Sequence, residues 1–282
     1  MKTLLITSLY SNLWGTEYGG RPSRGHHYKV SLLNILNLNP TKIICFTSPK
    51  EIDELSSFFY DAHKVDRNLL ELRSFNLADS RFFDEIRSKK DLEKMKTLDR
   101  CYEIQYNKFF WFDLIQDRYS YDKVYWIDAG LSHGGLFPEE YRDSSKGYDS
   151  NFTVNLFKPE FLNKLNEETK DKISVLSKNN AGRFYWSQTI PENYYTEYNN
   201  SKHIIGGMFG GNPEKYEFFA REFEKLLTEL LDRESELYME EMIMSCLFVN
   251  HNDHFILREF DDWYKRENHE GDEYKYFYKL FL

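Results

Sequence analysis

The chain has 282 residues and a formal net charge of −9, so it is long enough for one large domain with its own core. The acidic balance argues against broad, non-specific binding of nucleic acid, which depends on Lys and Arg neutralising phosphates. The three cysteines are far apart and form neither a disulfide framework nor a zinc-binding spacing. No apolar run reaches the ~18 residues of a membrane span, and the apolar start is too short for a signal peptide, so we expect a cytoplasmic protein.

Along the first half of the chain, strand-like runs alternate with helical patterns. The sequence predicts strands at residues 3–9, 42–47, 63–72 and 122–128, and helical structure at residues 28–38 and 79–118. Alternation of this kind predicts a parallel or mostly parallel sheet with helices on both faces.

The pattern loosens after residue 135. Residues 141–151 and 169–202 are rich in Ser, Asn, Lys, Gly and Tyr, which indicates a functional lid or a mobile segment. Regular structure is expected again from residue 203, with a helix that has Asn212 as N-cap and runs to about Leu231. A second helix (235–248) and a short strand (255–258) follow. We expect a domain over residues 1–258 and an aromatic tail, residues 259–282, that packs back on it.

The most informative segment is the apolar run from Val124 to Ile127, which ends in Asp128 and is followed by Ala129 and Gly130. The run is apolar on both faces, as in a buried parallel strand. An acid at the carboxyl end of such a strand lies at the crevice where open α/β sheets bind ligands. The alternative is an ordinary Asp that caps the following turn.

Two further segments suggest contacts with phosphate. The loop after the first strand contains Thr7, Tyr10, several glycines and Arg21, and such a loop can hold a nucleotide; the alternative is a flexible surface loop. In the helix before the central strand, Arg100 and Lys108 are candidates for phosphate contact. For Glu103, on the same face as Arg100, we favour a solvated position with an internal ion pair.

Two segments in the second half complete the set. Paired glycines at residues 206–211, around Met208 and Phe209, would let a ligand approach the backbone, or else form a tight strand-to-helix connection. Glu240 and Glu241 form an acidic pair in an otherwise apolar helix. Glu240 is a candidate for an inward carboxylate, and surface charge is the alternative.

In this order, the segments resemble the GT-A fold glycosyltransferases, and more narrowly the bacterial HtrL/YibB-like family. The resemblance covers most of residues 1–258, with Trp126-Ile127-Asp128-Ala129-Gly130 and residues 206–211 as its specific parts. It implies an α/β, GT-A-like (Rossmann-like) fold: one domain with a mostly parallel central sheet flanked by helices and a loop and helical C-terminal lobe. It also implies an enzyme that moves a sugar from a nucleotide-sugar donor, expected to be UDP-linked, to a glycan acceptor such as a surface polysaccharide.

The resemblance also implies roles for individual residues. Catalytic roles fall to Asp128, Glu240 and Glu241. The residues expected to contact the donor are Thr7, Tyr10, Arg21, Arg100, Lys108, Asp128, Ala129, Gly130, Gly206, Gly207 and Phe209. Asp128 would also help to hold Mn²⁺ or Mg²⁺, but Gly130 stands where many of these enzymes place a second metal-binding acid. His133 is the expected substitute ligand, with His251, His254 and His269 as other candidates.

Two other functions stay open at this stage. One is a glycosyltransferase that acts on a hydroxylated base in phage DNA, which the acidic composition argues against. The other is a nucleotide- or glycan-binding module without catalysis. The aromatic tail is equally compatible with a dimer surface, a contact with a membrane surface and a packed flap, and the sequence leaves the oligomeric state open.

Overall fold

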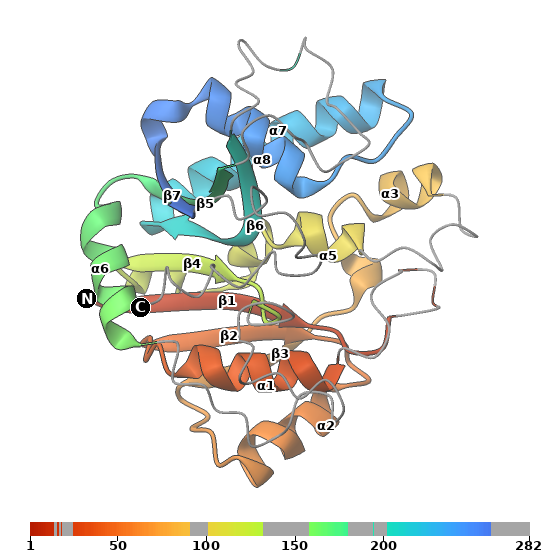
Figure 1. The fold of residues 1–282 in the computed structure, drawn as a ribbon. Coiled ribbons are helices and arrows are strands. Elements are labelled where there is room, and N and C mark those ends of the chain that lie inside the picture. The colour runs from red at the N-terminus through yellow and green to blue at the C-terminus, as the bar shows by residue number, and fades with distance from the viewer. Residues whose placement is uncertain are drawn as a thin grey trace, which may run out of the picture.

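The computed structural model describes residues 1–13, 16, 18, 25–90, 101–131, 158–179, 194 and 202–260. At its centre is a seven-stranded sheet with the order β3-β2-β1-β4-β6-β5-β7 (Figure 1). The strands are β1 (Thr3–Leu9), β2 (Lys42–Thr47), β3 (Leu70–Ser74), β4 (Lys123–Ile127), β5 (Ile173–Asn179), β6 (Lys202–Gly211) and β7 (Phe255–Phe260). Only β6 runs against the other strands of this sheet. The expected α/β class, with a mostly parallel central sheet flanked by helices, is confirmed.

Helices cover both faces of the sheet. One face carries α1 (Gly25–Leu36), α2 (Ile52–Ser56) and α6 (Pro159–Thr169), which share an apolar cluster with Leu5 and Tyr125. The other face carries α3 (Phe83–Lys89), α5 (Tyr102–Asn107), α7 (Pro213–Arg233) and α8 (Glu240–Asn250), which pack with Leu4 and Trp126. A π-helical turn (Ser57–Ala62) and 3-10 turns (Leu77–Asp79, Trp111–Leu114, Arg118–Ser120, Asn252–His254) connect these elements.

The coverage explains the apolar strands. Alternate residues of a strand point to opposite faces, so Leu4 and Ile6 enter one core cluster while Leu5 and Leu9 enter the other. Every residue of β4 is buried. A strand covered on both sides has no polar face, which is the pattern seen in the sequence of residues 124–127.

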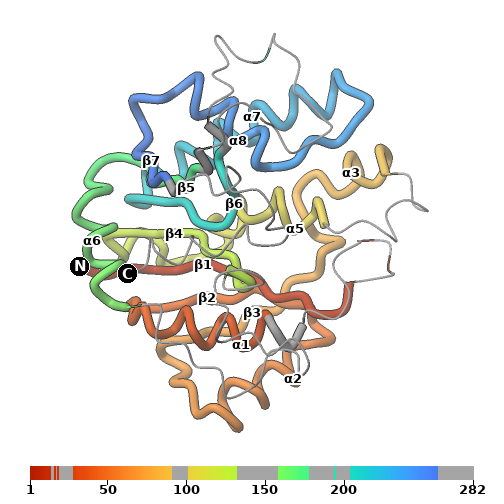
Figure 2. The backbone as a smooth tube through the Cα atoms, in the orientation of Figure 1, coloured from red at the N-terminus to blue at the C-terminus, as the bar shows by residue number. Residues whose placement is uncertain are grey.

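The order of the strands creates a switch point between β1 and β4. From β1 the chain moves outward to β2 and β3, and then returns to β4 on the other side of β1 (Figure 2). Open α/β sheets bind ligands outside the carboxyl ends of the strands at such a point. Tyr10 and Asp128 are the first residues after β1 and β4. The prediction that Asp128 follows a buried parallel strand is therefore confirmed.

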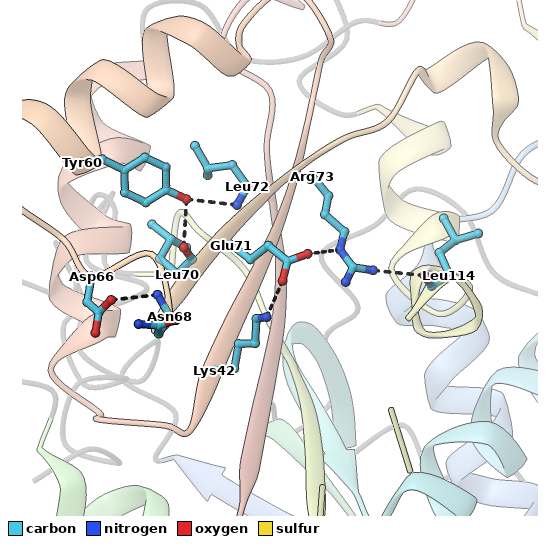
Figure 3. Close-up of polar contacts among 9 residues, drawn as sticks. All are labelled: Lys42, Tyr60, Asp66, Asn68, Leu70, Glu71, Leu72, Arg73 and Leu114. Atoms are coloured by element: carbon cyan, nitrogen blue, oxygen red, sulfur yellow. Dashed lines mark hydrogen bonds and ion pairs between the residues drawn. The ribbon is translucent and has the colours of Figure 1, made fainter. Parts of the chain in front are cut away.

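A side chain covers part of the free edge of strand β3. The Tyr60 hydroxyl donates to the carbonyl of Leu70 at 2.8 Å and accepts from the amide of Leu72 at 3.2 Å (Figure 3). These backbone groups face away from β2, so Tyr60 covers part of the edge where another strand would pair. Beside it, Glu71 pairs with Lys42 and Arg73.

Several predicted boundaries were wrong. The strand expected over residues 63–72 begins only at Leu70. In the described parts of the helical region predicted over 79–118, the structure has α3, α5 and short turns, and the helix is interrupted at Lys90 and Cys101. The segment 169–202, expected to be a loop, contains β5. Its Ser, Lys and Asn residues concealed a strand in which Ile173 and Val175 are buried, and Ser177 is buried as well.

The described residues from position 202 to 260 otherwise agree with the sequence prediction. The predicted helix after Asn212 is α7, and the next helix, α8, begins five residues later than expected. Asn212 stands at the N-cap position, but its side chain accepts from Lys123 Nζ at 2.6 Å instead of capping the helix. The aromatic tail was expected to pack back on the domain. Its residues 261–282 lie outside the described part of the chain. In the parts of the chain that the structure describes, no helix has the length and apolar character to cross a bilayer.

Candidate functional site

Asp128 stands at the switch point with one side of its carboxylate fixed. Its amide donates to the carbonyl of Gly207 on β6 at 2.8 Å, and the indole of Trp126 donates to its Oδ1 at 2.7 Å. The backbone of Asp128 is thus tied to β6, and its carboxylate is tied to Trp126 on β4. Its side chain is nevertheless 44% exposed, so the site reaches solvent through this residue.

Lys108 joins three elements to Asp128. It follows directly after α5, and its Nζ donates to the carbonyl of Gly206 at 3.1 Å and to Glu240 Oε1 at 2.7 Å. The same nitrogen lies 3.9 Å from Asp128 Oδ1. Only 3% of the Lys108 side chain is exposed. Its ammonium is therefore an internal part of the site, and not the exposed phosphate contact that a surface lysine would make.

The acidic pair of α8 lies inside the protein. Glu240 and Glu241 occupy the first turn of the helix, where negative charge interacts favourably with the helix dipole. Glu240 Oε1 accepts from Lys108, and Glu241 Oε1 accepts from the amide of Gly206 at 3.2 Å. The inward position expected for Glu240 is confirmed, and Glu241 is buried as well.

Two glycines of β6 lie so close to other groups of the protein that a side chain would not fit. A Cβ on Gly206 would lie 2.6 Å from both Glu240 Oε1 and Lys108 Nζ, so the ion pair occupies the space that a side chain would need. Gly210 has a φ of +150°, and a Cβ there would lie 2.2 Å from the carbonyl oxygen of Val124. Gly206 therefore serves the site, whereas Gly210 serves the pairing of β6 with β4.

The electrostatic environment changes the behaviour of two groups. Desolvation raises the pKa of Asp128 to about 6; Glu240 and Glu241 add to the rise, while Lys108 and the hydrogen bond from Trp126 oppose it. For Lys108, burial alone would lower the pKa, but Glu240 and Asp128 more than offset this effect and the pKa is raised. Lys108 is thus a charged ammonium, and Asp128 changes its charge near pH 6.

The charges at this site suit a cation better than a bare anion. Three carboxylates, from Asp128, Glu240 and Glu241, surround one ammonium. A diphosphate would add negative charge, and Mg²⁺ commonly solves this problem with one or two carboxylates and the substrate's phosphates as ligands. Asp128, as the exposed carboxylate, fits that arrangement. Within the described ranges, no group of three His, Cys, Asp or Glu residues could hold a metal ion.

The histidines considered as metal ligands are not brought to Asp128 in the described structure. His133 and His269 lie outside the described residues. His251 and His254 follow the far end of α8, a helix of 11 residues and thus about 16 Å long. There, His251 lies 3.3 Å from Glu222, and His254 stacks on Phe218.

Several residues expected to contact the donor are packed in the core. The Tyr10 hydroxyl donates to the carbonyl of Phe75 at 3.0 Å, and the Phe209 ring stacks on Phe109. Thr7 is fully buried on β1. Ala129 and Gly130, which are also buried, form the turn that follows Asp128. Arg21 and Arg100 lie outside the described residues.

Two residues that the sequence interpretation missed shape the site. Trp126 orients Asp128, which directly follows β4 and is two residues along the chain. Residues two apart in extended chain point to the same side, and a buried indole N–H needs an acceptor, so this pair was open to prediction. Glu51, next to α2, accepts from the amide of Ser11 at 2.8 Å and from Asn12 at 3.0 Å. It fixes the start of the loop after β1, and no local pattern marks it.

Comparisons with known proteins found similar structures but no similar sequence. No family model and no curated protein matches the sequence, so membership of the HtrL/YibB-like family stays a prediction. Two similar solved structures are a 4-diphosphocytidyl-2C-methyl-D-erythritol synthase from Anaerococcus prevotii and a protein from Bacillus anthracis described as a glucose-1-phosphate thymidylyltransferase, in complex with sucrose. The first has a TM-score of 0.43 and the second 0.45, each at 10% identity over 93% of this chain, and they are covered over 90% and 88% of their own lengths. Likeness at this level does not extend to activity or ligands.

Proposed function

We propose that the protein is a glycosyltransferase that moves a sugar from a nucleotide-sugar donor, UDP-linked, to a hydroxyl group of a glycan. The observation that carries this proposal is the position of Asp128. Its carboxylate is exposed at the carboxyl end of β4, at the switch point of the sheet, and a buried Lys108–Glu240 pair lies directly behind it. Ligands of open α/β sheets bind at this place.

The residues at the site suit the chemistry of glycosyl transfer. The sugar passes through an oxocarbenium-like state, in which positive charge develops on the sugar while a nucleoside diphosphate leaves. Fixed carboxylates beside the sugar stabilise positive charge, and Glu240 and Glu241 are held in place by Lys108 and the Gly206 amide. Mn²⁺ or Mg²⁺ held by Asp128 would neutralise the charge of the leaving diphosphate.

The test is release of nucleoside diphosphate from a panel of nucleotide sugars, with glycan acceptors and Mn²⁺ present. We expect UDP release from at least one UDP-sugar by the wild-type protein, and loss of this release in Asp128→Asn. Glu71→Gln, on the far side of the sheet at β3, is the matched control and should keep full activity. No release from any donor, or unchanged release in Asp128→Asn, would contradict the proposal. Release of pyrophosphate from a nucleoside triphosphate and a sugar phosphate would indicate nucleotidyl transfer instead.

A further inference from the structure

One oxygen of the site lacks a partner. Glu240 Oε2 is buried, the side chain is only 4% exposed, and no hydrogen-bond partner for this atom exists among the described residues. A buried carboxylate oxygen without a donor is costly, because the charge has lost water and gained nothing in return. Such an atom calls for an explanation, and a role in the chemistry of a site is one of those known. Among the described residues that have such an atom, Glu240 is the carboxylate.

The contacts of Glu240 with the described residues hold its carboxylate with Oε2 unpaired. Its Oε1 is bound to Lys108, and Lys108 is in turn anchored by the carbonyl of Gly206. Gly206 has no side chain that would push the pair aside. Rotation of the carboxylate would exchange the two oxygens without giving the second one a donor.

The unpartnered oxygen belongs to the same cluster as the exposed Asp128. Lys108 Nζ lies 2.7 Å from Glu240 and 3.9 Å from Asp128, so one ammonium connects the buried carboxylate with the exposed one. A group bound at Asp128 therefore lies close to Glu240. The missing partner is a hydrogen-bond donor or a cation, since a phosphate oxygen would be repelled by the carboxylates. The ammonium of Lys108 already fills the cationic position beside Glu240, which favours an uncharged donor for Oε2.

We propose that Glu240 Oε2 accepts a hydrogen bond from a hydroxyl group of the donor's sugar, and that Lys108 is the positioning residue that aims this carboxylate. Glu240 then determines which sugar the site accepts. This inference rests on the proposed function, because it requires a nucleotide sugar at Asp128. A site built around a buried acceptor rejects an analogue that lacks the matching hydroxyl, since the acceptor is then left unpaired.

The experiment measures binding of UDP-glucose, UDP-galactose and single-deoxy analogues of each by titration calorimetry. In the wild-type protein, one deoxy position should weaken binding about 10- to 100-fold, as expected for loss of a hydrogen bond to a charged group. Glu240→Gln should reduce this ratio several-fold, whereas Glu71→Gln, which changes a carboxylate of β3 outside the site, should keep it. The ratio compares two ligands on one variant, so a general loss of structure does not change it.

A second variant covers the case in which Glu240→Gln folds poorly. Lys108→Met/Glu240→Met removes both charges together, and replacing a buried ion pair with apolar residues is often tolerated. It should bind the parent and the deoxy sugar equally. Equal binding of every deoxy analogue by the wild type, or a ratio that survives in both Glu240 variants, overturns the inference. Failure of all the nucleotide sugars to bind overturns the proposed function itself.

Discussion

Two Lys–Glu pairs are buried beside α5, and they have different surroundings. In the first, Lys90 at the end of α3 donates to both carboxylate oxygens of Glu103, at 2.6 and 2.7 Å, and both side chains are fully buried. In the second, Lys108 binds only one oxygen of Glu240, while the other has no partner in the described part of the chain.

Under the proposed function, this difference separates a pair that supports the fold from a pair that belongs to the site. Glu103 also accepts from the Cys101 thiol at 3.3 Å, so its hydrogen-bonding capacity is used within the protein. The Lys108–Glu240 pair is incomplete and adjoins Asp128, which is exposed. A buried pair that is complete joins elements of the fold, whereas an incomplete one beside an exposed carboxylate is suited to a ligand.

The largest expected effect is that of Gly206→Ala on the incomplete pair. The new Cβ would lie 2.6 Å from Glu240 Oε1 and Lys108 Nζ, and both are ends of flexible side chains that move aside. We expect transfer activity to fall at least about 100-fold, the loss typical of a displaced catalytic group, with little change in thermal unfolding. Gly210→Ala is the contrast, because its Cβ meets the backbone of β4 and should destabilise the fold. Full activity in Gly206→Ala would show that the pair is not part of the site.

The next effect is on stability at the complete pair. Glu103→Ala leaves the Lys90 ammonium buried without its partner, which typically costs about 3–5 kcal/mol. Chemical denaturation should show this loss in the free energy of unfolding. The folded fraction should still bind the donor with wild-type affinity. A selective loss of donor affinity, with stability unchanged, would reverse the assignment of the two pairs.

A smaller effect is expected from Asp128→Asn on the pH dependence of stability. The folded state raises the pKa of Asp128 from 3.8 to about 6. Above pH 6 the carboxylate is ionised in both states, and its charge then lowers the stability of the folded state. The neutral Asn should therefore raise Tm slightly at pH 7.5. The gain should shrink as the pH falls through 6 and vanish below about 4, where Asp128 is protonated in both states. A gain that grows toward acid pH would contradict this account of the site.

The smallest effect is expected at the exposed charges of β3. Glu71 pairs with Lys42 and Arg73, but all three side chains are partly exposed. Exposed ion pairs are worth between about 0 and 1 kcal/mol, so Glu71→Gln should change the free energy of unfolding by less than 1 kcal/mol. Denaturation in urea at low and high salt measures this, and a loss above 2 kcal/mol would place this network with the buried pairs.

The sequence predicted what depends on local pattern. The buried strand before Asp128 and the start of α7 after Asn212 follow from apolar runs and from Pro213, which fits the first turn of a helix. Glu103 was expected on a solvated face, and Lys108 was expected to meet phosphate. Both are buried, because their partners come from other elements.

Pairing across long distances in the chain is what the sequence did not reveal. Lys108 and Glu240 are 132 positions apart, and Glu51 reaches back 40 positions to Ser11. Such contacts depend on how α5, β6 and α8 pack together. The expected ligand-facing role of the glycines in residues 206–211 similarly omitted the side chains that fill the space beside Gly206.

The most direct test of the central claim is the affinity of the protein for UDP-sugars, measured by titration calorimetry on the wild type and on Asp128→Asn with Mn²⁺ present. We predict that at least one UDP-sugar binds the wild type and binds Asp128→Asn at least about tenfold more weakly, because the substitution removes the carboxylate charge at the switch point. Equal affinity in the two proteins would contradict the claim that Asp128 marks the donor site.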